Sequence, residues 1–270
     1  MAGLPLVMGI VNVTPDSFSD GGRFAEHDVA IERGLELFAE GADIVDVGGE
    51  STRPGATPVD PQEELRRVLP VVEALAAAGR VSIDTRRAAV AEAAVTAGAA
   101  IVNDVSASTD VMAVAGAVGA GYVAMHMQGV PATMQVAPTY DDVVAEVHAF
   151  LAERAAAAMA AGCSSVWVDP GIGFGKGDAH NLALLGALPD LVAAGTPVLV
   201  GASRKGFLGR LTGGAAVDDR VEASLAVATW AMAAGVAAVR VHDVAVTVAS
   251  RRIVFDHPPS RHPPSEEPAA

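Results

Sequence analysis

Polar and charged residues end or follow eight short apolar runs that are spread along the chain. The carboxylates and the amide in this set, Asp84, Asn103 and Asp169, offer acceptors and donors in a fixed frame, as a flat heterocycle with several N–H groups requires. The basic members can oppose a phosphate-like charge. A neutral ring with an anionic leaving group would fit both halves. The basic members are Arg53, Arg204, Lys205 and Arg240, with His242 to help them.

Two Gly-rich segments invite comparison with phosphate-binding loops. The string DPGIGFGKG (169–177) follows an apolar run, but Pro170 stands where a Walker loop needs Gly, and Gly177 stands where it needs Ser or Thr. It is therefore not a P-loop. The segment 46–55 brings backbone N–H groups together with two hydroxyls and Arg53, which would suit an anion-binding nest. A plain surface loop is the simpler alternative for it.

The elements that must position these residues follow from the hydrophobic pattern. Val- and Ile-rich runs alternate with Ala-rich stretches of helical periodicity, which predicts a parallel sheet covered by helices. The predicted strands are 6–11, 44–47, 81–83, 101–102, 122–125, 166–168, 198–200 and 239–241. The predicted helices are 28–40, 61–78, 87–97, 110–118, 141–161, 181–194, 220–234 and 244–252.

Eight such units fill the chain, which favours closure into one TIM (β/α)₈ barrel of the α/β class over a doubly wound open sheet. We expect this single domain to cover residues 1–255. The strands of a TIM barrel converge on one mouth at their C-terminal ends. A single polar residue at a strand end is more simply explained as a helix cap or a turn former, but polar residues at the ends of all eight predicted strands predict a site. They include Asn12, Asp46, Glu50, Asp84, Asn103, Asp104, His126, Asp169, Ser203, Arg204, Lys205, Arg240, His242 and Asp243.

Composition limits the class of protein. The formal net charge of −14 argues against broad binding to nucleic acid or to an anionic membrane. The only cysteine, Cys163, cannot form an intramolecular disulfide, and the apolar opening lacks the basic segment of a signal peptide, so we expect a cytoplasmic protein. No apolar run reaches the length of about 18 residues that a membrane helix needs. The Pro-rich stretch 256–270 is expected to be a disordered tail.

Read as whole strings, the motifs resemble the dihydropteroate synthase family, and they span residues 8 to 244. The matching strings are MGIVNVTPDSFSDGG (8–22), DIVDVGGESTRPGA (43–56), VSIDT (81–85), IVNDVS (101–106), MHMQGVPATMQ (125–135), DPGIGFGKG (169–177), GASRKGFLG (201–209) and RVHDV (240–244).

The resemblance implies a role for each matching residue. Four residues would hold a pterin ring, with Met125 packed against it: Asp84, Asn103, Asp169 and Lys205. Five would engage the diphosphate, the first through Mg²⁺: Asn12, Thr52, Arg53, Arg240 and His242. The aminobenzoate pocket would use Phe18, Asp20, Pro54, Phe174 and Ser203. The residues expected to carry the chemistry are Asp84, Asn103, Asp169, Lys205 and Arg240.

The implied activity is the transfer of a (dihydropterinyl)methyl unit from its diphosphate to para-aminobenzoate, which gives dihydropteroate and diphosphate in folate biosynthesis. The resemblance also implies a homodimer and a target of sulfonamides. Loops 12–24 and 48–60 would close over the substrates. Two departures from the family pattern are Ala107, where Gly is common, and Gly206, where a polar residue is often seen.

Three alternatives stay open at this point. A pterin-binding methyltransferase barrel would share the ring-holding residues, and a catalytically inactive paralogue would share the fold. A metal-dependent hydrolase could use His126, Asp169, His242 and Asp243 as ligands, although no H-E-x-x-H motif occurs.

Overall fold

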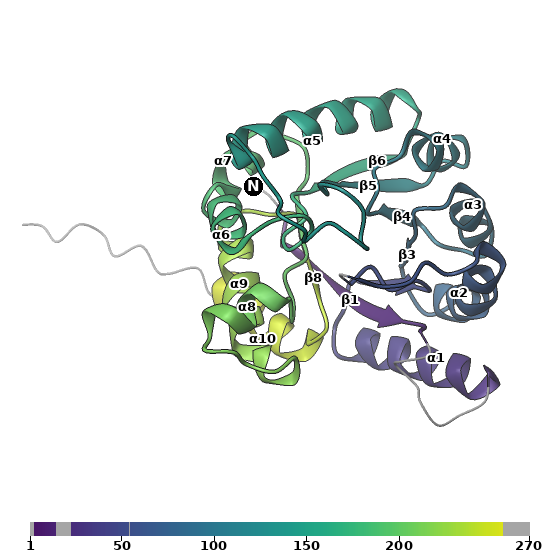
Figure 1. Cartoon of the computed structure of the whole chain (residues 1–270). Coiled ribbons are helices and arrows are strands. Elements are labelled where there is room, and N and C mark those ends of the chain that lie inside the picture. The colour runs from purple at the N-terminus through teal and green to yellow at the C-terminus, as the bar shows by residue number, and fades with distance from the viewer. Residues whose placement is uncertain (1–2, 15–22, 54, 256–270) are drawn as a thin grey trace, which may run out of the picture.

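A closed ring of eight parallel strands forms the centre of the molecule (Figure 1). The computed structural model describes residues 3–14, 23–53 and 55–255. The strands pair in chain order, β8 returns to β1, and a parallel bridge between Val168 and Val198 joins β6 to the β7 segment. The predicted TIM barrel is therefore confirmed. The strands are β1 Leu6–Asn12, β2 Ile44–Gly48, β3 Val81–Asp84, β4 Ile101–Asp104, β5 Gly121–Met125, β6 Ser165–Asp169, β7 Leu199–Val200 and β8 Ala238–Val241.

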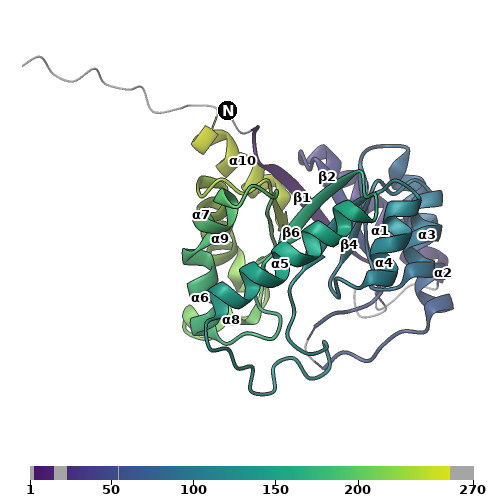
Figure 2. The same ribbon diagram turned by 90° about the horizontal axis from the view of Figure 1, so that it is seen from above.

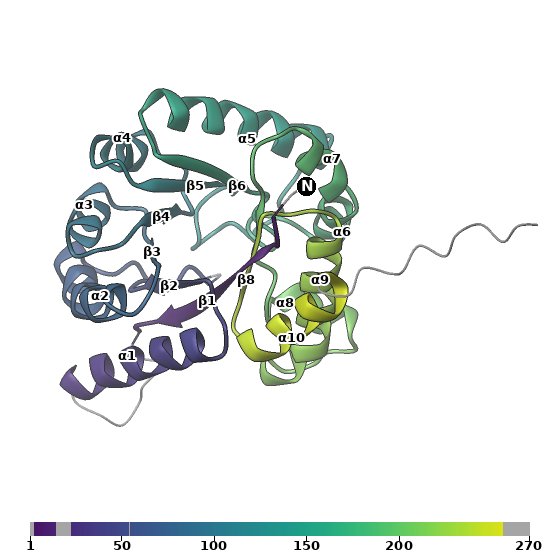
Figure 3. The same ribbon diagram turned by 180° about the vertical axis from the view of Figure 1, so that it is seen from behind.

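Helices surround this ring, as the opposite views in Figures 1 and 3 show, and α5 lies across the outside of β6 in Figure 2. They are α1 Arg23–Ala39, α2 Pro61–Ala76, α3 Ala88–Thr96, α4 Thr109–Ala117, α5 Val143–Ala160, α6 Asp178–Gly186, α7 Leu188–Ala193, α8 Gly206–Leu211, α9 Val221–Ala233 and α10 Val244–Phe255, with a short 3₁₀ turn at Asp218–Arg220. No helix among the described residues is both long and apolar enough to span a membrane.

The helix predicted over 181–194 is instead two helices, which corrects the sequence reading. Ala187 ends α6, and Pro189 lies in the first turn of α7. Proline has no N–H to donate, so it is tolerated in a first turn and breaks a continuing helix. The sequence reading also missed α8, which begins after the segment 201–205 that follows β7.

Alternation along each strand builds two separate apolar layers. The outward residues pack against the helices, whereas the inward ones form a plug at the base of the barrel. Two residues further along, the inward positions become polar: Ile44 is followed by Asp46, Ile101 by Asn103, Trp167 by Asp169 and Ala238 by Arg240. The plug consists of Met8, Ile44, Ile101, Val123, Trp167, Leu199 and Ala238. The polar layer thus lies directly above the apolar plug.

Some polar residues at strand ends do only the simpler structural work. Asp104 accepts hydrogen bonds from the N–H groups of Ser106 and Ser108 and from the Tyr122 hydroxyl at 2.8 Å, so it fixes the turn after β4. Asp84 differs, because the residue before α3 is Arg87 and no side chain caps that helix. Asp84 therefore has no capping role.

A buried ion cluster fixes the segment that leaves β2. Arg87 forms ion pairs with Glu50, which precedes the loop, and with Glu64 in α2, whose side chain is 1% exposed. Arg87 also donates to the carbonyl of Val59 at 2.5 Å, and Thr85 donates to Glu64. One guanidinium thus ties both ends of the loop 51–58 to the barrel.

Replacing Arg87 by Met should lower the free energy of unfolding by about 3 kcal/mol, because it leaves Glu64 buried without its cation. Urea denaturation measures this. Adding Glu64→Gln should restore part of the loss, because it removes the unpaired charge. Arg66→Ala is the matched control: Arg66 is 55% exposed and pairs with Glu63 at the surface, so the loss should stay within about 1 kcal/mol. Equal losses for Arg87→Met and Arg66→Ala would contradict the cluster's role.

Candidate functional site

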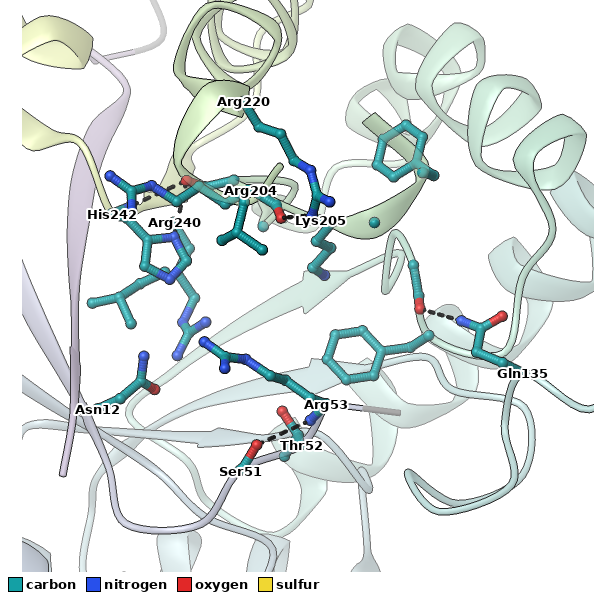
Figure 4. A pocket seen from close by; sticks show the side chains of 18 of the residues that line it. Asn12, Ser51, Thr52, Arg53, Gln135, Arg204, Lys205, Arg220, Arg240 and His242 are labelled. Atoms are coloured by element: carbon teal, nitrogen blue, oxygen red, sulfur yellow. Dashed lines mark hydrogen bonds between the residues drawn. The ribbon is translucent and has the colours of Figure 1, made fainter. Parts of the chain in front are cut away.

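The polar layer opens into a cavity of about 810 Å³ at the C-terminal end of the strands. Its described lining comes from β1, β3, β8 and the segments after β2, β5, β6 and β7. In Figure 4 the labelled side chains of Asn12, Arg53, Lys205, Arg240 and His242 point into one shared space from different sides. The sequence analysis therefore predicted the convergence correctly for these five.

The floor of the site is a buried charge cluster. Arg240 donates through Nε to Asp46 Oδ2 at 2.6 Å and through Nη2 to Asp84 Oδ2 at 2.9 Å. Asn103 donates through Nδ2 to the same Asp46 oxygen at 3.1 Å. Strands β2, β3, β4 and β8 each supply one member. The cluster places two acidic groups, one amide and one cation around the closed end of the cavity.

A second group of charges comes from the segments after β6 and β7. Asp169 ends β6, is 5% exposed, and accepts the N–H of Gly171 at 2.7 Å. Lys205 donates to the carbonyl of Ile172, and its Nζ lies 4.2 Å from the centre of the Phe174 ring. This cation–π contact aligns the aromatic wall with the ammonium group. Asn103, Met125 and Asp169 lie below the described surface of the cavity.

Burial perturbs the ionisation of this cluster. Burial raises the pKa of Asp84 to about 7, with Arg240 opposing the rise and Asp46 adding to it. Burial also raises the pKa of Asp169, an effect that nearby Lys205 opposes. The pKa of Lys205 falls to about 8 because the ammonium is removed from water, although Asp169 offsets part of this effect. Such shifts in one cavity are typical of a functional site.

Sequence reasoning noted Lys176 only in rejecting a P-loop, yet it organises the segment after β6. Its Nζ lies 2.9 Å from His126 Nδ1 and within 3.2 Å of the carbonyls of His126, Gly171 and Phe174. Burial lowers its pKa to about 7. Positive φ at Gly171, Gly173 and Gly175 lets the backbone wrap around the ammonium. The glycines therefore shape a turn around a lysine.

His126 was expected at the mouth, and it follows β5 there, but its side chain does not line the cavity. It is 8% exposed, contacts Lys176, and packs edge-on against Phe150. Burial and the Lys176 charge lower its pKa to about 4. Among the described residues no group of three or more His, Cys, Asp or Glu side chains could hold a metal ion, so the ligand set of the hydrolase alternative, His126, Asp169, His242 and Asp243, does not assemble.

The opposite side of the cavity carries polar and basic groups. Asn12 ends β1, and Thr52 and Arg53 lie on the segment after β2. His242 follows β8, and its Nδ1 lies 3.0 Å from Ser203 Oγ. Burial, with Arg240 and Arg204, lowers the pKa of His242 to about 4, so the ring is neutral at pH 7. The Arg53 guanidinium makes no hydrogen bond to any described residue.

Arg204 was predicted to oppose an anion, but its guanidinium is paired with two carboxylates of the protein itself. It donates through Nη2 and Nε to Asp243 at 2.6 and 3.1 Å, and through Nη1 to Asp218. Its backbone has a φ of 56°, and Arg220 donates to its carbonyl at 3.0 Å. Arg204 therefore fixes the turn before α8. The missed residues Arg220 and Asn181 line the cavity too, but no motif in the sequence contains them. Gln135 also lines the cavity, and it ends the quoted string 125–135, to which the resemblance gave no role beyond Met125.

The remaining predicted residues divide into two groups. Phe174 and Ser203 line the cavity, as expected. Phe18, Asp20 and Pro54 lie outside the described residues, as do most of loop 12–24 and the tail 256–270. Of the two departures, Ala107 has a φ of 46°, which explains why Gly suits that position. An added Cβ at Gly206 would meet only Arg210 at 3.4 Å.

The chain is similar to proteins of one known family. The family model described as "Pterin binding enzyme" matches residues 8–242. The chain is 52% identical over 260 residues to dihydropteroate synthase of Mycobacterium leprae, with 92% of each chain covered. It is also similar to the solved structure of Xanthomonas albilineans dihydropteroate synthase with 4-aminobenzoic acid, with a TM-score of 0.86, 50% identity, and 92% and 91% of the two chains covered.

A second Xanthomonas albilineans structure, in complex with 7,8-dihydropteroate, has a TM-score of 0.83 and 47% identity, with 92% of each chain covered. These matches extend over the whole barrel.

The Lys176 turn leads to a prediction about Gly171. A Cβ added at Gly171 would lie 1.9 Å from the carbonyl oxygen of His126, at a φ of 66° that side chains rarely adopt. Gly171→Ala should therefore lower the free energy of unfolding by at least about 3 kcal/mol in urea denaturation. Gly186→Ala, with nothing within 4 Å and no positive φ, should be neutral or slightly stabilising. A Gly171→Ala protein as stable as Gly186→Ala would refute the turn's close packing.

The raised pKa of Asp84 predicts a pH dependence of stability. Between pH 4 and its folded pKa of about 7 the native state binds more protons at this residue than the unfolded chain. Ligand-free protein should therefore lose stability at this residue as pH rises through that window. Denaturation from pH 5 to 7.5 should show a flatter pH dependence for Asp84→Asn than for wild type. The exposed Asp178→Asn control should keep the wild-type slope; identical slopes for all three proteins would rule the effect out.

Proposed function

Because the chain belongs to the dihydropteroate synthase family of pterin binding enzymes, we propose that its barrel mouth joins a dihydropterin diphosphate to para-aminobenzoate, giving dihydropteroate and diphosphate. One observation carries this proposal: a buried frame of acceptors and donors closes one end of the cavity, while cationic and polar groups line its other side. The bound molecules named for the two Xanthomonas structures, 4-aminobenzoic acid and 7,8-dihydropteroate, correspond to the second substrate and the product.

The ring would be held by the floor of the cavity. Asp84 and Asp169 would accept ring N–H groups, and Lys205 would donate to a ring acceptor. Asn103 would contribute its amide, and Met125 would pack against the ring from below. The pKa is about 7 for Asp84 and about 8 for Lys205. A ring N–H that donates to Asp84 would favour its carboxylate, and a ring acceptor would favour the Lys205 ammonium, so both groups would be charged near neutral pH.

The diphosphate would lie toward Asn12, Thr52, Arg53 and His242. The Arg53 guanidinium makes no hydrogen bond to a described residue, and neutral His242 would donate through Nε2 while Nδ1 accepts from Ser203. Arg240 would contribute through Nη1, because Nε and Nη2 are bonded to the floor carboxylates. These groups would stabilise charge as it develops on the departing diphosphate.

A magnesium ion would suit this side of the cavity. Mg²⁺ prefers hard oxygen ligands and is often held by one or two protein oxygens together with substrate phosphates. The Asn12 amide oxygen, at the cavity end of β1, is such a ligand. We propose Asn12 as its protein ligand. When bound, the ion would neutralise part of the diphosphate charge.

The reaction then needs no protein nucleophile. Electron density from the dihydropterin ring would stabilise the methylene carbon as its bond to the diphosphate oxygen loosens. The arylamine nitrogen would then attack that carbon and lose a proton. The protein would position both reactants and stabilise the leaving-group charge. Phe174 and Ser203 would line the aminobenzoate position, with Phe18, Asp20 and Pro54 as further candidates.

We also propose a cytoplasmic homodimer. Three large apolar side chains are exposed on neighbouring helices of one side: Leu182 of α6 at 49%, Trp230 of α9 at 51% and Ile253 of α10 at 76%. An interface between copies would cover them. Light scattering should then give twice the chain mass of 27.2 kDa.

Turnover is the direct test of the proposed reaction. Purified protein with dihydropterin diphosphate, para-aminobenzoate and Mg²⁺ should form dihydropteroate and diphosphate. A sulfonamide, which resembles the arylamine substrate, should inhibit. A methyltransferase barrel or an inactive paralogue would form no dihydropteroate, so a folded, inactive wild-type protein would reject the proposal.

The position of Arg53 at the cavity leads to a binding prediction. Diphosphate with Mg²⁺ should raise the melting temperature, because a ligand of the folded state stabilises it by mass action. Arg53→Ala should remove most of this rise, which differential scanning fluorimetry measures. Arg210→Ala is the control, since Arg210 also lines the cavity but is paired with Asp178 at 3.0 Å. The same rise in all three proteins would place the anion elsewhere.

A further inference from the structure

Asp46 is a fully buried carboxylate to which neither the sequence motifs nor the proposed mechanism gives a role. It lies at the centre of β2 with no exposed surface, below the residues that line the cavity. Its Oδ2 atom accepts both from Arg240 Nε at 2.6 Å and from Asn103 Nδ2 at 3.1 Å. One oxygen atom therefore contacts both Asn103, which would hold the ring, and Arg240, which would contact the diphosphate, from strands on either side of β2.

The contact with Asn103 fixes which way its amide faces. A carboxylate oxygen can only accept a hydrogen bond, so the NH₂ group must turn toward Asp46. The Asn103 carbonyl oxygen is thereby left as an acceptor for a ligand. If the amide were reversed, its oxygen would face the negative carboxylate, and a donor would face the ring instead.

The contact with Arg240 fixes the plane of the guanidinium. Asp46 binds Nε and Asp84 binds Nη2, so two hydrogen bonds from different strands hold the group rigidly. A planar fork held at two points can direct its remaining nitrogen only one way. Nη1 makes no hydrogen bond to a described residue and is the part of Arg240 that remains available to a ligand.

Asp46 is a poor choice for stability alone. Its second oxygen, Oδ1, has no hydrogen-bond partner among the described residues, so its buried charge depends on Arg240 and Asn103. Buried ion pairs contribute little net stability, because removing both charges from water costs about as much as their attraction returns. If Asn replaced Asp46, Arg240 would still be paired with Asp84, so the buried cation would not be left alone.

We propose that Asp46 is a positioning residue for the pterin half of the reaction, holding the Asn103 amide with its oxygen toward the ring and the Arg240 guanidinium in one plane. The inference rests on the proposed function. Asp46 acts through its two partners and does not touch the substrate.

The test compares Asp46→Asn with Ser82→Ala. Ser82 pairs in register with Asp46 on the neighbouring strand and is equally buried, but no site residue is bonded to it. Steady-state kinetics in the Mg²⁺-containing assay should show a loss in Asp46→Asn of about 10–100-fold in kcat/KM for dihydropterin diphosphate, the loss known for outer partners of metal-bound side chains. The KM for para-aminobenzoate should stay near the wild-type value, and Ser82→Ala should behave as wild type.

The pH dependence of kcat/KM distinguishes a positioning role of Asp46 from a purely structural one. Asp84 faces Arg240, Lys205, Asp46, Glu64 and Asp104. Removing the Asp46 charge takes away a negative neighbour of Asp84. Arg240 then has Asp84 as its one remaining carboxylate partner in the cluster, so the pKa of Asp84 should fall. The acid limb of kcat/KM should therefore move to lower pH in Asp46→Asn and stay in place in Ser82→Ala.

The outcomes are separable. No turnover by wild type would reject the proposed function itself. Wild-type turnover with an unchanged kcat/KM and an unchanged acid limb in Asp46→Asn would overturn the positioning role alone. Unfolding of Asp46→Asn while Ser82→Ala stays folded would show that Asp46 is structural, which also overturns the proposal. In folded Asp46→Asn, a smaller thermal shift by diphosphate and Mg²⁺ than in wild type would support the positioning of Arg240, and an equal shift would count against it.

Discussion

The buried charge cluster of Asp46, Asp84 and Arg240 is the constraint on which the rest of the structure depends. Charges placed inside a barrel are costly unless each has an opposite partner and hydrogen bonds at good geometry. Arg240 meets this requirement for two carboxylates at once, at 2.6 and 2.9 Å. Beneath the cluster the apolar plug excludes water, and above it the cavity opens. The site is therefore organised before any ligand arrives, because Arg240 already holds both carboxylates in place.

Rigidity and adaptability are divided between the strands and the segments that follow them. Strand ends supply the floor, where Asp84, Asn103 and Asp169 are fixed by the register of the sheet. The segments after β2 and β6 supply the walls. Arg87 ties down the two ends of the former, and Lys176 gathers the carbonyls of the latter. Such an arrangement suits the proposed function, in which the strand ends would hold a flat ring at fixed positions.

The strand and helix pattern predicted the barrel, and the polar residues at strand ends predicted its mouth, because alternation and apolar periodicity are local properties of the sequence. Pairings between distant strands are not local. Asp46 and Arg240 are 194 residues apart, and only the closed sheet brings them together. For the same reason Arg204 was read as a free cation, although Asp243 neutralises it. Lys176 looked like a failed P-loop because nothing in the sequence shows that its ammonium turns inward.

Proton counting on pterin binding tests the central claim that this buried cluster reads the ring. Near pH 7 the Asp84 carboxyl is partly protonated in the free protein, since burial raises its pKa to about 7. A ring that donates N–H groups to Asp84 must drive this proton off. Titration calorimetry of a hydroxymethyl pterin without diphosphate, in buffers of different ionisation enthalpy, should show net proton release by wild type and none by Asp84→Asn. Binding heats that do not depend on the buffer, or the same release from both proteins, would contradict the account.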